Sequence, residues 1–320
     1  MTIEQPETIG VLLMSYGAAR TPEDVPAYMN HVYHGKAPQE LIEEFQRRYR
    51  LVGGSPLIEI TRQQAEALRD LLQAEAREGT RFVAEVGMRH TPPWIADGLR
   101  SLVEQGARRI VAIIMSPQYS PIIMGGYHRA IEEALRELPS DVQVTIAGPW
   151  HTEPDFIEAL AQRVREALER VPASERDTVP IVLTAHSLPK SVVDREPFYI
   201  DQLMETARAV ADKLGLADDR WMFAYQSAGH TPEEWLKPDL KDVLPGIRQA
   251  GHSSVLVVPV QFLADHLEIL YDIDVAAREE AESEGLKFYR IEVFNTMPLF
   301  IRALANVVRK ELKTEAMVAQ

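Results

Sequence analysis

The stretch PIVLTAHSLP, residues 180–189, is a short, almost unbroken apolar run that ends in polar residues. Three more runs of this kind are IGVLLMSYG (9–17), RIVAIIMSPQYS (109–120) and SVLVVPVQFLADH (254–266). Runs so short and so rich in Val, Ile and Leu are typical of strands buried on both faces of a parallel sheet. They decide the fold class, which we predict to be α/β.

Amphipathic segments, with apolar residues at helical spacing, separate these strands. They are PQELIEEFQRRYR (38–50), TRQQAEALRDLLQAEAREG (61–79), IADGLRSLVEQG (95–106), DFIEALAQRVREALERV (155–171) and DQLMETARAVADKLG (201–215). Weaker strand patterns occur at 81–88, 141–150 and 221–227. Regular alternation of strand and helix predicts βαβ units.

The order of these signals repeats in the two halves of the chain. An early strand in each half ends in an isolated aromatic or polar residue, Tyr16 or His186, and a later strand passes through Pro117 or Pro259. The segment VPASERDTVP at 171–180 has the composition of a seam between the halves. We therefore expect two similar lobes, residues 1–172 and 173–320, with the last helix able to pack back on the first lobe.

The chain has 320 residues, with 48 acidic and 34 basic side chains and a formal net charge of −14. This balance argues against nucleic acid as a partner, because phosphate binding depends on clustered Lys and Arg. Cysteine is absent, which excludes disulfides, zinc–thiolate sites, cysteine nucleophiles and Cys-ligated iron–sulfur clusters. The start of the chain lacks the basic and apolar stretches of a signal peptide, and no apolar run reaches the ~18 residues of a membrane span. We expect a cytoplasmic protein with no integral membrane segment.

His186 lies at the carboxyl end of a predicted strand, where ligands of open parallel sheets bind. A lone histidine is more often structural than functional. The turn Ser187-Leu188-Pro189, however, directs the chain outward immediately after His186. An imidazole there can serve as a metal ligand or as a proton acceptor near neutral pH.

Three carboxylates follow the apolar run that begins at residue 254. The spacing of Asp265, Glu268 and Asp272 places them on one face if this segment is a helix. A solvated helix face is the simpler interpretation. The first turn of the helix nevertheless follows directly from a strand, so it lies at the same sheet edge as His186. A histidine and carboxylates that converge there provide oxygen and nitrogen ligands for a divalent metal such as Fe²⁺.

Several segments, in order along the chain, resemble one known family. They are YG at 16–17, YRLVGGSPL (49–57), TAHSLP (184–189), QSAGHTPEEWLKPD (226–239) and VPVQFLADHLEILYD (258–272). Together they look like ferrochelatase. The resemblance implies a chelatase fold of two Rossmann-like lobes with parallel sheets and an active-site cleft between them. It also implies insertion of Fe²⁺ into a porphyrin in haem synthesis.

The resemblance assigns roles to the residues at the second sheet. His186 matches the family's active-site histidine and Glu268 its catalytic glutamate, so both are predicted to bind iron and to assist proton removal. Asp272 matches an acid four residues further on and would be an outer acid, whereas a later glutamate of some members is Ala276 here. Because metallation removes two N–H protons from the porphyrin, an imidazole beside a carboxylate suits this chemistry.

Four residues of the first half are similar to the porphyrin contacts of the family: Tyr16, Arg48, Ser55 and Tyr127. Tyr16 aligns with a tyrosine that, in the coproporphyrin-using branch, faces the iron from the side opposite the histidine. For Arg48, a solvated helix arginine is an equally good interpretation.

The chain lacks the C-terminal extension and cluster cysteines common in eukaryotic protoporphyrin enzymes, so it resembles the soluble, monomeric form that converts coproporphyrin III to coprohaem III. Three alternatives remain: protoporphyrin IX as substrate, a Co²⁺ or Ni²⁺ chelatase of a more reduced tetrapyrrole, and, more distantly, a non-catalytic haem carrier. The resemblance implies porphyrin and Fe²⁺ as substrates, no permanently bound cofactor, no iron–sulfur cluster and only transient haem-pathway partners.

Overall fold

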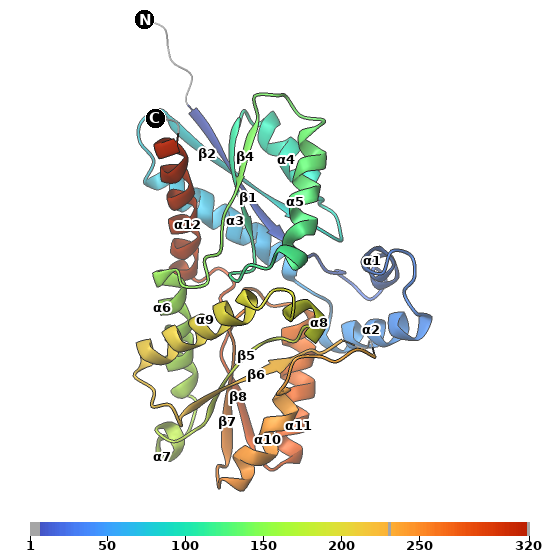
Figure 1. Ribbon diagram of the computed structural model, residues 1–320, viewed down its shortest axis with the longest axis vertical. Helices are drawn as coiled ribbons and strands as arrows, with labels where there is room; N and C mark the ends of the chain where they lie inside the picture. Colours follow the sequence, from blue (N-terminus) through green and yellow to red (C-terminus); the bar gives the residue numbers. More distant parts are fainter. Residues whose placement is uncertain (1–6, 230–231, 319–320) are drawn as a thin grey trace, which may run out of the picture. The chain divides into compact units, whose positions relative to one another are not determined.

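The computed structural model describes residues 7–229 and 232–318 (Figure 1). Residues 230–231, inside the segment QSAGHTPEEWLKPD, lie outside the described residues. The chain forms two compact units. One comprises the residues up to Glu153 together with those from Asn295 onward, and the other comprises Pro154–Phe294.

The first unit is built on a parallel sheet of four strands in the order β2-β1-β3-β4. Its strands are β1 (Glu7–Ser15), β2 (Thr80–Met88), β3 (Arg109–Ile114) and β4 (Gln143–Ile146). Leu12 in β1 lies opposite Glu85 of β2 and Ala112 of β3, which defines the register. Strand β1 is buried from Ile9 to its end, as expected of a central strand covered on both faces.

Six helices of the described residues belong to this unit. They are α1 (Val25–Val32), α2 (Gln39–Val52), α3 (Leu57–Ala74), α4 (Ile95–Glu104), α5 (Pro121–Leu135) and α12 (Pro298–Val318). Helices α3 and α4 contact β1 and β2, and α12 contacts α3 and β3. Leu12, Leu99, Ile110 and Ile131 belong to one buried cluster, which joins β1, α4, β3 and α5.

The second unit repeats the arrangement with a parallel sheet in the order β6-β5-β7-β8. Its strands are β5 (Ile181–His186), β6 (Trp221–Gln226), β7 (Ser254–Pro259) and β8 (Lys287–Arg290). Thr184 in β5 lies opposite Ala224 of β6 and Pro259 of β7. Two parallel sheets with flanking helices confirm the predicted α/β class; strand β8 was not predicted.

Seven helical segments accompany this second sheet among the described residues. They are α6 (Pro154–Leu168), α7 (Ala173–Arg176), α8 (Lys190–Val193), α9 (Phe198–Leu214), α10 (Leu240–Gln249), the π-helix η1 (Glu268–Ala277) and α11 (Arg278–Ser283). Helix α6 packs against α9, and η1 continues directly into α11. Val257, Leu244, Ile273 and Phe288 lie in one buried cluster that joins β7, α10, η1 and β8.

The boundary between the units differs from the predicted division into residues 1–172 and 173–320. Helix α6 belongs to the second unit because it packs against α9 and contacts β7, so the chain crosses over at Glu153 and Pro154. Helix α12 belongs to the first unit because it packs against α3 and β3 (Figure 1). Polar turn residues at 171–180 suggested a seam, but helix packing decides which unit each helix joins.

No helix within the described part of the chain combines the length and the apolar character needed to cross a membrane.

Candidate functional site

The strand ends of the second sheet bring several polar side chains to one edge. His186 is the last residue of β5, and Gln261 follows the end of the neighbouring strand β7. The backbone N–H of His186 donates to Gln261 Oε1 at 3.0 Å, and Gln261 Nε2 donates to the hydroxyl of Tyr199 at 2.5 Å. These bonds fix the backbone of His186 where β5 ends.

The imidazole of His186 faces a carboxylate. Its Nε2 lies 3.7 Å from Oε2 of Glu268, and its Nδ1 lies 2.5 Å from the carbonyl oxygen of Ser187. A carbonyl oxygen only accepts hydrogen bonds, so Nδ1 carries the proton in the neutral ring. The lone pair of Nε2 therefore points toward the Glu268 side and is available to a metal ion or a proton.

A second histidine, His266, completes this group. Its Nε2 lies 3.8 Å from Glu268 Oε2, and its Nδ1 donates to the carbonyl oxygen of Ala264 at 2.9 Å. One carboxylate oxygen of Glu268 therefore lies between two imidazoles. His266 was not among the residues predicted from the sequence, although its place two residues before Glu268 was the signal that could have identified it.

The two imidazoles control the charge of this group. Burial alone would raise the pKa of the Glu268 carboxyl, but His186 and then His266 outweigh it and lower that pKa to about 2. Burial likewise would lower the pKa of His266, but its contacts with Glu268 raise it overall. Glu268 is thus held as a carboxylate at neutral pH, and His266 is biased toward its charged form.

The segment that carries Glu268 is a π-helix rather than the α-helix implied by the predicted carboxylate face. Asp265 precedes η1 and lies outside it, so the prediction that Asp265, Glu268 and Asp272 share one helix face was wrong. Bonding from i to i+5 widens the helix, and residues four or five apart lie one turn apart. Glu268 and Asp272 are such a pair. Asp272 Oδ2 accepts a bond from Ser227 Oγ at 2.6 Å, at the end of β6.

In the first unit, Tyr16 and Tyr127 both contact Arg89. Tyr16 follows β1 and is 42% exposed, while Tyr127 lies buried on α5. The Arg89 guanidinium carbon lies 6.0 Å from the ring centre of Tyr16 and 5.7 Å from that of Tyr127. Burial raises the pKa of Tyr127, and the Arg89 charge opposes that rise. A Cβ at Gly126 would lie 2.2 Å from the Arg89 guanidinium carbon, so only glycine allows this approach.

Arg89 was also missed in the sequence analysis, although it follows the end of β2, where a ligand-facing residue is expected. Its neighbour His90 is buried, and the His90 ring lies 4.3 Å from the ring of Tyr16. His90 Nδ1 lies 3.0 Å from Nδ1 of His31 on α1. Burial, then Arg89 and His31, lower the pKa of His90 to about 4, so this ring is neutral at pH 7.

Arg48 and Ser55 lie in a different segment of the first unit. Arg48 Nε donates to Glu44 Oε1 at 2.8 Å, and its side chain is only 17% exposed, so Arg48 is not a freely solvated helix arginine. Ser55 is buried: its N–H donates to the carbonyl of Arg20 at 3.1 Å, and its Oγ has no hydrogen-bond partner among the described residues. A buried hydroxyl without a partner can serve a ligand at little desolvation cost.

The donor set around Glu268 is small. Nowhere among residues 7–229 and 232–318 do three or more His, Asp or Glu side chains gather so as to hold a metal ion. His186 and Glu268 remain the pair that can face an incoming cation, because the Nε2 lone pair and the carboxylate oxygens are the ligands that Fe²⁺ accepts. The two side chains lie close together, as expected from the sequence, while their catalytic and metal-binding roles stay predictions.

The chain is similar to one known family along most of its length. The ferrochelatase family model matches residues 8–312. A ferrochelatase of Deinococcus radiodurans is 40% identical over 312 residues, which cover 97% of this chain and 98% of that protein. A coproporphyrin III ferrochelatase of Geobacillus kaustophilus is 38% identical over 312 residues, with the same coverage of 97% and 98%.

Solved structures show the same fold at low sequence identity. SirB from Bacillus subtilis with Fe³⁺ matches with a TM-score of 0.60 and 14% identity over 95% of both chains. A likeness at that identity speaks for the fold alone. The family match extends over nearly the whole chain, and relatives that share well over a third of its residues align along nearly their full length. The family suggested by the sequence is thereby confirmed: the chain belongs to the ferrochelatase family.

Proposed function

We propose that this protein inserts Fe²⁺ into coproporphyrin III and releases coprohaem III in haem biosynthesis. The observation that carries the proposal is the position of one Glu268 oxygen between the imidazoles of His186 and His266. Relatives named coproporphyrin III ferrochelatase, such as that of Geobacillus kaustophilus, support the choice of substrate.

The proposed chemistry divides the work between imidazole and carboxylate. Insertion exchanges two pyrrole N–H protons for one Fe²⁺, so protons must be accepted close to the ring face. With a pKa of about 2, the Glu268 carboxylate is too weak a base to hold a proton at pH 7. His186 Nε2 is the proposed iron-facing ligand and, once iron has passed to the ring, the acceptor that takes the two pyrrole protons one after the other and passes each to water. Glu268 offsets the positive charge that iron and protons bring. Asp272, one turn further along η1, is proposed as the outer acid.

The porphyrin itself is proposed to bind through residues of the first unit. Coproporphyrin III carries four propionates, and the net charge of −14 must be overcome locally to hold it. Arg89 supplies such a charge beside Tyr16 and Tyr127. Arg48 and Ser55 are proposed as further contacts. The hydrogen bond to Glu44 fixes the position of the Arg48 side chain, and the Ser55 hydroxyl is buried without a partner among the described residues.

A substrate competition under anaerobic conditions tests this function. The protein is given limiting Fe²⁺ with equal coproporphyrin III and protoporphyrin IX, and the two metalloporphyrins are separated and measured by absorbance. We expect coprohaem III to be the main product. A preference for protoporphyrin IX would overturn the substrate assignment. If the protein inserted Co²⁺ or Ni²⁺ into sirohydrochlorin faster than Fe²⁺ into coproporphyrin III, the proposed reaction would be wrong. Tight haem binding without any metal insertion would favour a haem carrier.

We also propose that the protein is monomeric, holds no resident cofactor or iron–sulfur cluster, acts in the cytoplasm and meets haem-pathway partners only transiently. Light scattering during size-exclusion chromatography tests the oligomeric state, and cell fractionation tests the location. A stable dimer or a membrane-bound pool would contradict the corresponding part.

A further inference from the structure

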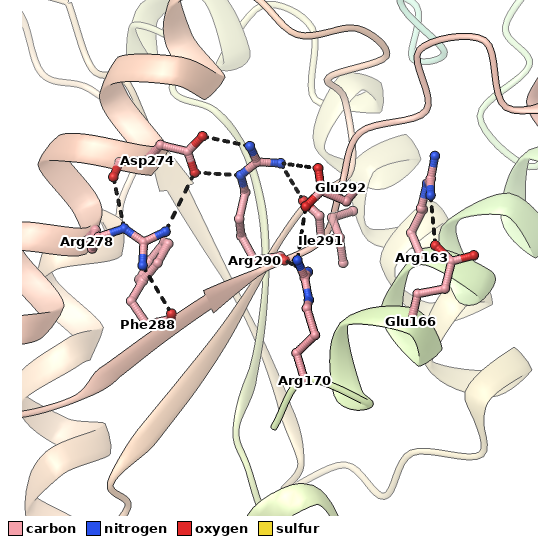
Figure 2. A network of polar contacts seen from close by, with 9 residues as sticks. All are labelled: Arg163, Glu166, Arg170, Asp274, Arg278, Phe288, Arg290, Ile291 and Glu292. Atoms are coloured by element: carbon pink, nitrogen blue, oxygen red, sulfur yellow. Dashed lines mark hydrogen bonds and ion pairs between the residues drawn. The ribbon is translucent and has the colours of Figure 1, made fainter. Parts of the chain in front are cut away.

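The π-helix that carries Glu268 is tied to the rest of its unit by a cluster of charged side chains. Asp274 lies in η1, Arg278 is the first residue of α11, and Arg290 is the last residue of β8. We call these three residues the Asp274 anchor. Figure 2 shows the Asp274 carboxylate between the two arginine side chains, with Arg290 reaching from the strand toward the helix.

The contact between Asp274 and Arg290 is a two-point one. Arg290 Nε donates to Asp274 Oδ1 at 2.7 Å, and Arg290 Nη2 donates to Oδ2 at 2.6 Å. A planar guanidinium that binds both oxygens fixes the orientation of the carboxylate as well as its distance. The Arg290 side chain is only 11% exposed, and its Nη1 donates to the carbonyl of Ile291 at 2.8 Å. The Arg290 side chain is therefore held in one position by burial and hydrogen bonds.

Arg278 binds the backbone of the same helix where its hydrogen bonding changes. The π-helix η1 ends at Ala277 and α11 starts at Arg278. When bonding changes from i→i+5 to i→i+4, one carbonyl in the last π turn is passed over. Arg278 Nε donates to the backbone carbonyl of Asp274, in that turn, at 3.1 Å. Its guanidinium also lies over the ring of Phe288 in β8, 5.0 Å from the ring centre.

The anchor and Glu268 share one helix, so a change at the anchor can reach Glu268. Glu268 starts η1, and Asp274 lies six residues later on the same helix. π-helices are rare because their backbone bonding is less favourable than that of an α-helix, so a long one needs outside support. If Asp274 were released, the segment could tighten to α-helical bonding, and Glu268 would rotate about the helix axis relative to the fixed strand β8. Its carboxylate would then leave the two imidazoles.

We propose that Asp274 and Arg290 are positioning residues, which hold η1 in its π-helical form and so keep Glu268 between His186 and His266. The inference rests on the proposed function only in that Glu268 is taken as the carboxylate that faces iron. Neither Asp274 nor Arg290 needs to touch a substrate, because both act through the helix.

The test uses two changes of the anchor and one matched control. Asp274→Asn keeps the size of the side chain but removes one acceptor and the charge, and Arg290→Lys keeps the charge but loses the two-point contact. Arg163→Gln is the control, since Arg163 forms an ion pair with Glu166 at 2.8 Å within α6 of the same unit (Figure 2). We expect kcat for iron insertion to fall about 10- to 100-fold in both anchor variants, the size of effect that a misplaced group causes. The control should change less than about twofold.

A double-mutant comparison separates positioning from general loss of stability. If Asp274 acts through Glu268, then in a Glu268→Gln background Asp274→Asn should lower the residual rate by less than about twofold. An equal fold-loss in both backgrounds would overturn the proposal. The proposal would also be overturned if kcat in the two anchor variants equalled kcat in the Arg163→Gln control.

Hydrogen exchange gives a readout that needs no activity. In the full-length protein, we expect the backbone amides of residues 268–277 to exchange at least about tenfold faster in Asp274→Asn than in the parent, with no such change in Arg163→Gln. Unchanged exchange rates at residues 268–277 would overturn the proposed role of Asp274. This test still decides if the residual rate of Glu268→Gln is too low for the double-mutant comparison. If the parent inserts no iron, the proposed function fails while the exchange result still decides the anchor.

Discussion

The two sheets have the same strand order but present different side chains at their carboxyl ends. In the first sheet, β1 and β2 lead into Tyr16, Arg89 and a buried, neutral His90. In the second, β5 and β7 lead to His186 and to the π-helix that starts with Glu268. One end therefore offers a cation and aromatic rings, and the other offers imidazoles around a carboxylate.

This difference suggests how one fold, used twice, serves a reaction with two unlike substrates. An anionic macrocycle needs arginine and ring surfaces, whereas a divalent cation and departing protons need imidazole and carboxylate. Parallel strands of the same order place their ends alike in both units, so specialisation requires changes only in the residues that follow each strand.

The largest effect is expected from removing His186. In His186→Ala, Nε2 is lost as ligand and proton acceptor, so the rate of iron insertion should fall by at least about 10³-fold, within the range of acid–base catalysis. Binding of coproporphyrin III, measured by fluorescence quenching, should change less than about threefold because the first unit is unaffected. A variant that keeps its rate, or that loses porphyrin binding instead, would break the proposed division between the sheets.

The opposite pattern is expected for Arg89. Arg89→Leu removes the charge beside Tyr16 and Tyr127, and a lost charged hydrogen bond of about 1.5–3 kcal/mol corresponds to a roughly 10- to 100-fold higher KM for coproporphyrin III. The KM for Fe²⁺ should stay within about twofold. Arg47→Leu is the control, since that arginine is 56% exposed and pairs with Glu44. Equal changes in both arginine variants would show that Arg89 has no special role.

A milder test moves Arg89 without removing it. In Gly126→Ala, the new Cβ would lie 2.2 Å from the Arg89 guanidinium carbon, so the tip of the arginine must shift. We expect the KM for coproporphyrin III to rise roughly 3- to 10-fold while thermal stability does not fall, because alanine favours the helix. Gly125→Ala is the matched control, since its nearest neighbour is Arg129 Nη1 at 3.4 Å. An unchanged KM in Gly126→Ala would show that the position of Arg89 is not important.

Strands β1 to β7 and the convergence of His186 with Glu268 follow from the sequence because both depend on local pattern. Apolar runs identify buried strands, and parallel strands bring their ends together whatever the details of the helices. His266 and Arg89 could not be ranked in the same way. His266 is important through its contact with Glu268, and Arg89 through its closeness to Gly126. Only the folded chain brings Arg89 and Gly126 together.

The π-helix lies beyond sequence reasoning for a different reason. Over ten residues, the spacing of apolar side chains differs too little between i→i+4 and i→i+5 bonding to separate the two. The choice is made by tertiary contacts, here the pairing of Asp274 with Arg290 on a strand that sequence analysis did not predict. The unit boundary is similar, because α6 joins the second unit by packing on α9 and not by any local signal.

The smallest expected effect is on the free energy of unfolding, and it concerns two carboxylates. Glu268 in the second unit and Glu44 in the first both have a pKa lowered to about 2. Glu44 is held by Arg47 and Arg48, which stay charged at all usual pH values, whereas Glu268 is held by histidines. A carboxyl with a lowered pKa stabilises the fold above its unfolded pKa near 4.5, and this contribution is lost as pH falls toward 2. A histidine with a raised pKa, such as His266, stabilises below about 6.5, and its contribution is lost as pH rises through the folded value.

The two carboxylates should therefore differ in how their stability contributions depend on pH. In metal-free protein, Glu268→Gln should lower the free energy of unfolding by less than about 1 kcal/mol, since the side chain is partly exposed. The loss should be greatest between about pH 4.5 and 6.5, and it should shrink above that range as His266 loses its proton. Glu44→Gln should show a loss that stays level above about pH 4.5, because arginine does not titrate there. Denaturant unfolding across pH 4 to 9 measures both. If the two stability losses varied with pH in the same way, groups other than histidine would lower the pKa of Glu268. The chemical contrast between the two units would then lose its basis.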